Sequence, residues 1–176
     1  GITVADLVAR GRYPHQSMLR QWSAADESAV RSAMDATNIT PLSTRAVDEL
    51  SGGQRQRVWV AMALAQETDL LLLDEPTTYL DIAHQVELLD LFAMLNRTQG
   101  HTVVAVLHDL NHACRYADEI VAMKAGRIVD HGDPRTVVTA ELIADVYGLS
   151  CQIIDDPQTS TPLIVPRASP YLTAGR

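Results

Sequence analysis

The sequence lacks a long apolar run, a secretory leader and a closely spaced pair of cysteines. Crossing a bilayer takes roughly 18 consecutive apolar residues, and no stretch of the chain approaches that length. The opening Gly-Ile-Thr-Val has neither the basic start nor the apolar core of a signal peptide. It also lacks an initiator methionine, as a chain that begins within a longer protein would. The apolar fraction of 47% and charged fraction of 20% are those of an ordinary globular domain.

Clustered basic charge is also missing, because the net charge is −8. Nucleic-acid binding needs a clustered basic surface, so we expect no nucleic-acid partner. We interpret the scattered arginines of the first 57 residues as making local contacts; they include Arg10, Arg12, Arg20, Arg55 and Arg57.

Hydrophobic spacing divides the chain into a helical start and a later alternation of strands and helices. Residues 1–47 are predicted to be mostly helical, with a capped helix from 24 to about 37. Further helices are expected over 54–65, 83–97 and 139–147, and strands over 70–73, 102–107, 119–123 and 127–130. Such alternation indicates an α/β domain with a mainly parallel sheet.

The segment Ser51-Gly52-Gly53-Gln54 stands directly before a predicted helix. Two glycines allow close approach of the backbone to a ligand, and a helix start offers N–H groups and positive dipole to an anion. The alternative is a capped helix start without a ligand.

The run of four leucines that ends in Asp74-Glu75 predicts a buried strand with two carboxylates at its C-terminal end. Open α/β sheets place their ligands at that edge. Asp74 could hold Mg²⁺ and Glu75 could polarise an attacking water. The alternative is a helix-capping Asp beside a solvated Glu.

His108 ends the next apolar strand, where an imidazole could bond both a phosphate oxygen and an attacking water. A structural histidine is the alternative. Asp109 and Asp81 could each simply cap the helix that follows.

Taken together, these segments resemble the ATP-binding proteins of ABC transporters. The resemblance runs from the signature motif, Ser51 to Gln54, through the Walker B strand and D-loop to the switch histidine. Three stretches resemble the branch that serves iron–siderophore, haem and vitamin B12 importers, with siderophore import favoured: Gly11-Arg12-Tyr13-Pro14-His15, Asp74 through Asp81, and Leu107 through Asn111.

The resemblance implies roles for these residues. Ser51, Gly52, Gly53 and Gln54 would contact the nucleotide of a second ATPase subunit in a head-to-tail dimer. Asp74 would serve Mg²⁺ and Glu75 would be the general base. His108 would sense the γ-phosphate of ATP, and Asp81 would complete the nucleotide-binding set at the dimer interface.

It also implies a fold and a location. The expected fold is an α/β, P-loop NTPase-like, mainly parallel sheet with helices on both faces and a helical subdomain, without the N-terminal part. The expected segments are 1–65 (helical subdomain through the signature helix), 66–155 (α/β portion) and 156–176 (proline-rich tail, loosely ordered past Val165). Transmembrane permease subunits are the expected partners, Gly11–His15 would lie near them, and the protein would be peripheral on the cytoplasmic face of the plasma membrane. In the cytosol, Cys114 and Cys151 are expected to be buried thiols.

No Gly-x-x-x-x-Gly-Lys-Ser/Thr loop occurs in the chain. In the family this loop cradles the β- and γ-phosphates. We therefore expect the chain alone neither to bind ATP in the usual mode nor to hydrolyse it. We also expect an apolar face left exposed where the family has further strands. Two alternatives stay open: a non-hydrolysing interaction module, and an ABC ATPase without a transporter.

Overall fold

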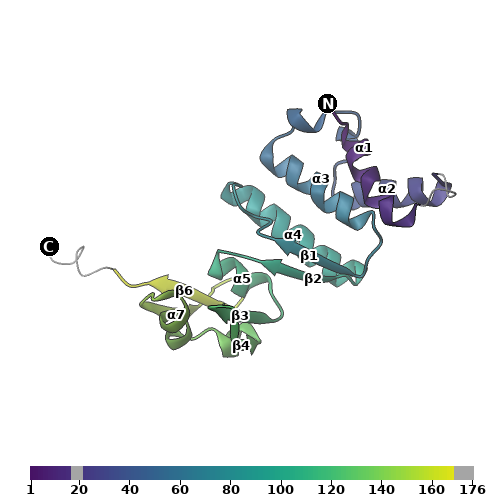
Figure 1. Ribbon diagram of the computed structural model, residues 1–176. Helices are drawn as coiled ribbons and strands as arrows, with labels where there is room; N and C mark the ends of the chain where they lie inside the picture. The colour runs from purple at the N-terminus through teal and green to yellow at the C-terminus, as the bar shows by residue number, and fades with distance from the viewer. Residues whose placement is uncertain (17–21, 169–176) are drawn as a thin grey trace. The chain divides into compact units, whose positions relative to one another are not determined.

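The computed structural model describes residues 1–16 and 22–168, which form two compact units, Gly1–Val106 and Leu107–Arg176. The first unit holds the helical region and one parallel strand pair (Figure 1). Its elements are α1 Val4–Ala9, η1 Arg10–His15, α2 Ala24–Ala36, η2 Thr40–Leu42, η3 Val47–Glu49, α3 Gly52–Leu64, β1 Leu70–Asp74, α4 Ile82–Gln99 and β2 Thr102–Val106. The second unit holds α5 Leu110–Tyr116, β3 Ile120–Lys124, β4 Arg127–Gly132, α6 Pro134–Val137, α7 Ala140–Tyr147, β5 Cys151–Asp155 and β6 Pro162–Pro166.

The helical region packs α1, α2 and α3 against one another (Figure 1). Ser23 and Asp26 close the predicted capping box at the start of α2, which satisfies N–H groups that a helix end leaves unpaired. The core of the region includes Val4, Val8, Ile39 and Val58, which are fully buried.

A buried ion pair holds η1 inside this region. Nε of Arg12 donates to Oδ1 of Asp26 at 2.9 Å, and both residues are buried. One Nη of Arg12 also bonds the carbonyl oxygen of Ala65 and a carboxylate oxygen of Glu67, each at 2.7 Å. A Cβ on Gly11 would collide with the carbonyl oxygen of Met62, so only glycine fits there. Arg12 was expected to make a local contact, but its partners lie 14 to 55 residues away along the chain; Arg20 lies outside the described residues.

Strands β1 and β2 pair in parallel, with Leu70 opposite Thr102 and Asp74 opposite Val106. Helix α4 packs along this pair (Figure 1). Side chains alternate between the faces of a strand, and Leu71 is 3% exposed whereas Leu72 is 71% exposed. We call the exposed side the open face; its large apolar residues are Leu70, Leu72, Val104 and Val106. The expected exposed apolar face is thus confirmed.

The second unit is built from two antiparallel hairpins and short helices. Ala125 and Gly126 both have positive φ at the predicted turn between β3 and β4, as tight hairpin turns require. Cys114 and Cys151 lie in one buried cluster as free thiols, as predicted. Burial raises the pKa of Cys114 to about 11, with a smaller contribution from the charge of Asp109, so this thiol is not a reactive one.

The segment from residue 156, which was expected as a proline-rich tail, contains a strand that the sequence did not predict. Residues 162–166 form β6, because their backbone pairs with β5 from Asp155 to Cys151. Residues 169–176, where the loosely ordered end was expected, lie outside the described residues. The compact units divide at Val106 because they follow packing, whereas the expected segments follow the motifs, so those segments stay a prediction. Among the described residues, no helix combines the length and apolar character that crossing a membrane requires.

Candidate functional site

The signature segment forms the start of α3. The backbone N–H of Gln54 donates to Oγ of Ser51 at 3.3 Å, and the N–H of Ser51 donates to Oε1 of Gln54 at 3.2 Å. The capped-helix reading is therefore right in structural terms. It leaves the N–H groups of Gly52 and Gly53, which have no acceptor within the helix, at the positive end of its dipole. Capping and anion binding are compatible here.

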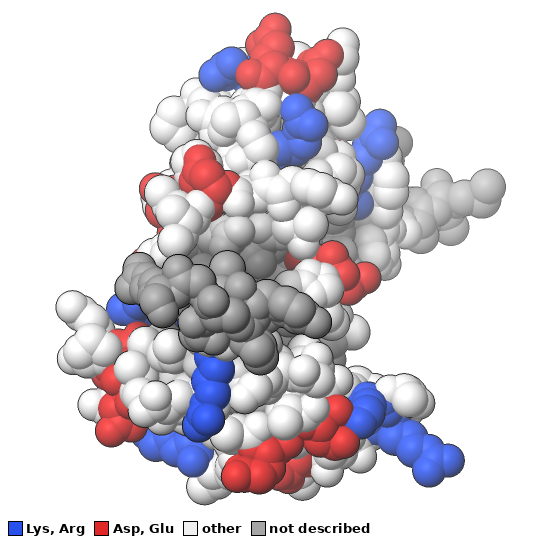
Figure 2. All heavy atoms as spheres, turned by 90° about the vertical axis from the view of Figure 1, so that its left-hand side faces the viewer, with Lys and Arg blue, Asp and Glu red and all other residues white. Residues whose placement is uncertain are grey.

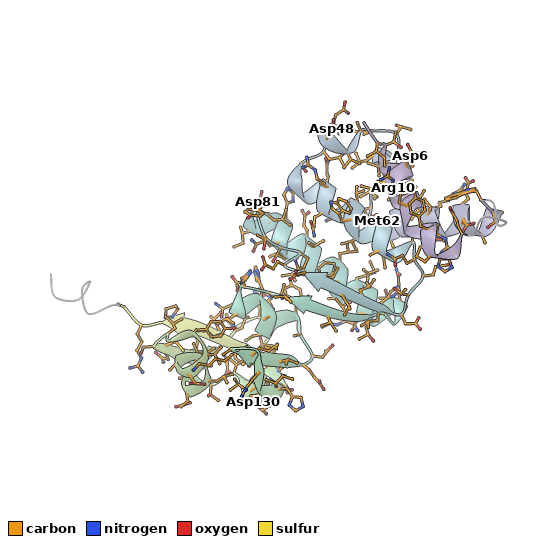
Figure 3. The ribbon with its side chains drawn as sticks, viewed as in Figure 1. Asp6, Arg10, Asp48, Met62, Asp81 and Asp130 are labelled. Carbon is orange, nitrogen blue, oxygen red and sulfur yellow. The ribbon has the colours of Figure 1, made fainter. Side chains whose placement is uncertain are left out.

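The two glycines pack against the turn that precedes α4. A Cβ on Gly53 would lie 3.0 Å from Cγ of His84, and one on Gly52 would lie 3.6 Å from Leu80. Asp81 lies between these two and caps α4, accepting from the N–H of His84 at 2.9 Å (Figure 3). The structure thus brings together the start of the signature helix and the segment around Asp81.

Three charged or titratable side chains reinforce this contact. Nδ1 of His84 lies 3.3 Å from Oε2 of Glu87, and Arg57 donates to the same oxygen at 3.0 Å. Bonds from His84 and then Arg57 lower the pKa of Glu87. A surface hollow of about 330 Å³ is lined by these residues and by Ser51 and Gly53. The sequence did not point to His84, although His84 stands three residues after Asp81, where a capping Asp accepts a bond from the backbone N–H.

Asp74 is the last residue of the parallel strand β1, and Glu75 follows it directly. Residues 75–79 form a turn and not a helix, so the alternative of Asp74 as a helix cap is wrong. By alternation Asp74 shares the open face with Leu70 and Leu72. Glu75 has a φ of +48°, an uncommon conformation for a residue other than glycine, and accepts a hydrogen bond from the hydroxyl of Thr78 at 3.2 Å.

His108 and Asp109 belong to the second unit and stand between β2 and α5. Asp109 caps α5, accepting from the N–H of His112 at 2.8 Å, as the structural alternative predicted. His108 is exposed. The structure gives no reason to call it a core residue.

The residues at the end of β1 fit a magnesium ion in chemical terms. Mg²⁺ takes one or two carboxylates and completes its shell with water and substrate phosphates. Asp74 is an exposed carboxylate at a sheet edge, which matches that need. Among the described residues, no group of three or more His, Cys, Asp or Glu forms a metal cage.

On the face drawn in Figure 2, the described Lys and Arg side chains are scattered among acidic ones.

A parallel strand followed by adjacent carboxylates, with a glycine-rich helix start in the same unit, is typical of an α/β protein that binds its ligand at the carboxyl end of its strands. The family model described as "ABC transporter" matches residues 3–78. The chain is 61% identical over 165 residues to the ferric enterobactin transport ATP-binding protein FepC of Escherichia coli K12, covering 94% of this chain and 61% of the relative. It is 55% identical over 166 residues to the petrobactin import ATP-binding protein FpuD of Bacillus anthracis, covering 94% and 61%.

A solved structure of a metal-chelate type ABC transporter in an inward-facing conformation matches with a TM-score of 0.86 at 31% identity. That match covers 95% of this chain and 68% of the other. The chain belongs to the ATP-binding proteins of the ABC transporter family, and the expected P-loop NTPase-like fold is confirmed. Within the described residues the strands form one parallel and two antiparallel pairs. It spans about 61% of the length of the curated relatives named above.

Proposed function

We propose that the chain is part of the ATP-binding subunit that powers an importer of iron–siderophore complexes. The observation that carries the proposal is the presence in one compact unit of Asp74-Glu75 at the end of β1 and of a glycine-rich start of α3 whose Ser51 and Gly52 are exposed. The names of relatives that act on ferric enterobactin and petrobactin support the choice of cargo.

Glu75 is the proposed general base. Its carboxylate takes a proton from the water that attacks the γ-phosphorus of ATP, and the positive φ of Glu75 turns the backbone sharply at the point where β1 ends. His108 is the proposed switch that bonds the γ-phosphate. Asp74 would hold Mg²⁺, which when bound neutralises charge on the phosphates.

Ser51 to Gln54 are proposed to serve the nucleotide of a second subunit. The N–H groups of Gly52 and Gly53 would donate to its γ-phosphate at the positive end of α3. Asp81 lies beside them and would face the same subunit interface. Such a head-to-tail dimer uses one chain's β1 end and the other chain's α3 start for each nucleotide.

The permease subunits are proposed to meet the segment Gly11–His15. Within it Gly11 and Arg12 are buried, whereas Tyr13 is 62% exposed and Pro14 is also exposed, so Tyr13 and Pro14 offer contact area. This arrangement places the subunit on the cytoplasmic face of the membrane.

The 176 residues by themselves are proposed to be inactive. The phosphate-binding loop needs a lysine after glycine, and the one lysine of the sequence, Lys124, follows Met123. Without that loop, Asp74 and Glu75 present negative charge to an anionic nucleotide.

The test joins the chain in frame to an upstream segment that supplies a phosphate-binding loop. We expect Mg²⁺-dependent ATP hydrolysis by the joined protein and none by the 176 residues alone. Glu75→Gln should lower kcat by at least about a hundredfold, the scale of general-base catalysis. Glu119→Gln, an exposed carboxylate in the second unit, is the matched control and should leave kcat unchanged. Turnover by the isolated chain that Glu75→Gln abolishes would contradict the inactivity.

A second candidate is a module that docks on a complete ATPase without hydrolysis. The observation behind it is the intact, capped start of α3. Under this reading the isolated chain should raise the ATP turnover of a signature-defective complete subunit, and Gly53→Ala should remove the effect because its Cβ meets His84.

A further inference from the structure

The side chain of Asn111 binds both backbone groups of one strand residue. The N–H of Ile164 donates to Oδ1 of Asn111 at 2.7 Å, and Nδ2 of Asn111 donates to the carbonyl oxygen of Ile164 at 3.3 Å. Asn111 is in the first turn of α5 and Ile164 is the central residue of β6. The amide therefore takes the place of a neighbouring strand.

The outer edge of β6 offers no other place for such a contact. Two backbone bonds flank the strand: the N–H of Asp156 donates to the carbonyl oxygen of Thr161, and the N–H of Arg167 donates to the carbonyl oxygen of Ser150. Because bonding alternates along an antiparallel pair, the backbone N–H and C=O groups of the odd-numbered residues of β6 point toward β5. The backbone N–H and C=O groups of the even-numbered residues therefore point away from β5. Among the five described residues of β6, two of these three outward positions are prolines, Pro162 and Pro166, which have no N–H to donate.

The contact is consequently fixed in register. A slip of two residues in either direction would set the Oδ1 of Asn111 against a proline nitrogen, and the bond from the strand would be lost. The side chain of Ile164 is also buried in the same cluster as Cys114, which lies one helical turn after Asn111. Hydrogen bonds and packing thus tie α5 to a single position on β6.

The start of α5 carries the switch segment. Asp109 caps the helix, and His108 directly precedes that cap. Fixing the first turn of α5 fixes the backbone at Asp109, and so limits where the backbone of His108 can lie. A displacement of about 1 Å in a catalytic group can cost a hundredfold in rate.

We propose that Asn111 is a positioning residue for His108. Its two bonds to β6 set the position of the first turn of α5, and thereby the position of the backbone at His108. The inference rests on the proposed function for the role of His108 as the switch. The hydrogen-bonding part of it concerns α5 and β6 alone and does not depend on nucleotide.

The first experiment uses the 176-residue chain and NMR. Asn111→Ala should speed hydrogen exchange of the Ile164 amide by at least about tenfold, the equivalent of one lost hydrogen bond. The ring Cε1–Hε1 signal of His108 should shift or broaden in the same variant. Asn111→Asp keeps the acceptor for the Ile164 N–H, so it should keep that amide slow to exchange.

The matched control is Asn96→Ala, whose amide donates to the carbonyl oxygen of His101 at 2.8 Å in the first unit. It should change neither the Ile164 amide nor the His108 signal. If Asn111→Ala speeds exchange at Ile164 and leaves His108 unchanged, Asn111 only covers a strand edge and the proposal is overturned. Unchanged exchange at Ile164 would overturn it as well.

The second experiment measures ATP turnover by the chain joined to a phosphate-binding loop. Asn111→Ala should lower kcat by roughly ten- to a hundredfold with KM for ATP unchanged, because position and not binding is lost. A wild-type kcat in that variant overturns the positioning role and leaves the proposed function standing. If the wild-type joined protein shows no turnover, the proposed function fails, and the exchange measurements still decide whether Asn111 orders His108.

Discussion

The helical region of residues 1–65 and the parallel pair β1–β2 share one compact unit, yet they complete their cores differently. The helical region buries Val4, Val8 and Ile39 with its own residues and holds η1 by the buried pair Arg12–Asp26. The parallel pair buries one face and exposes the other. The difference teaches that the helical region has a buried core among α1, α2 and α3, whereas the sheet has an apolar surface that further chain can cover.

The sharpest way to break the helical side of this comparison is Arg12→Met. It leaves the buried carboxylate of Asp26 without its cation and takes a donor from the Ala65 carbonyl. We expect the largest effect of any single change, a fall in Tm of roughly 10 °C or more by circular dichroism. Arg10→Met, two residues away on an exposed side chain, is the control and should stay close to wild type. If Arg12→Met and Arg10→Met lower the Tm equally, the buried ion pair is not what stabilises this region.

Two neighbouring leucines test the two faces of β1. Leu71→Ala removes a buried side chain and should lower the free energy of unfolding by about 2–5 kcal/mol. Leu72→Ala removes an exposed one and should change it by less than about 0.5 kcal/mol. Chemical denaturation of both variants measures the contrast. A large loss from Leu72→Ala at a concentration where the chain is monomeric would mean that Leu72 packs within the chain itself.

The open face should make the chain self-associate. Sedimentation velocity at rising concentration should show larger species, and Leu72→Ser with Val104→Ser should weaken association by at least about tenfold, because two apolar contacts are lost. Ile128→Ser with Val129→Ser changes exposed apolar residues of β4 and is the matched control. A chain that stays monomeric throughout would refute the expectation.

Acid should weaken the helical region through one carboxylate. Bonds from Ser23 and then Arg12 lower the pKa of Asp26 from 3.8 to about 2. Below pH 3.8 Asp26 is protonated in the unfolded chain but still ionised in the folded chain. The contribution of Asp26 to the free energy of unfolding is therefore full above that pH and is lost as pH falls toward about 2. Across this window the Tm measured by thermal unfolding should depend less on pH for Asp26→Asn than for wild type. Asp69→Asn, an exposed carboxylate, should leave the slope as it was.

Much of the fold could be predicted because local chemistry specifies it. Ser51 with Gln54, Asp81 and Asp109 are capping residues by type and position, and all three cap the expected helices. The strand 70–73 and the helix 83–97 follow from apolar spacing and lie within one or two residues of β1 and α4. The candidate site residues were found in the same way, by their place at strand and helix ends. Their catalytic roles remain predictions.

The sequence by itself determined the elements, the caps, the family resemblance and the missing phosphate-binding loop, because each depends on residues close together in the chain. Only the tertiary structure decided that Arg12 is buried against Asp26, that His84 packs on Gly53, and that Asn111 binds Ile164. These pairs are separated by 14 to 53 residues or depend on a shape that no local pattern encodes. Strand β6 was not predicted for the same reason, since its prolines discourage a strand until β5 and Asn111 supply its partners.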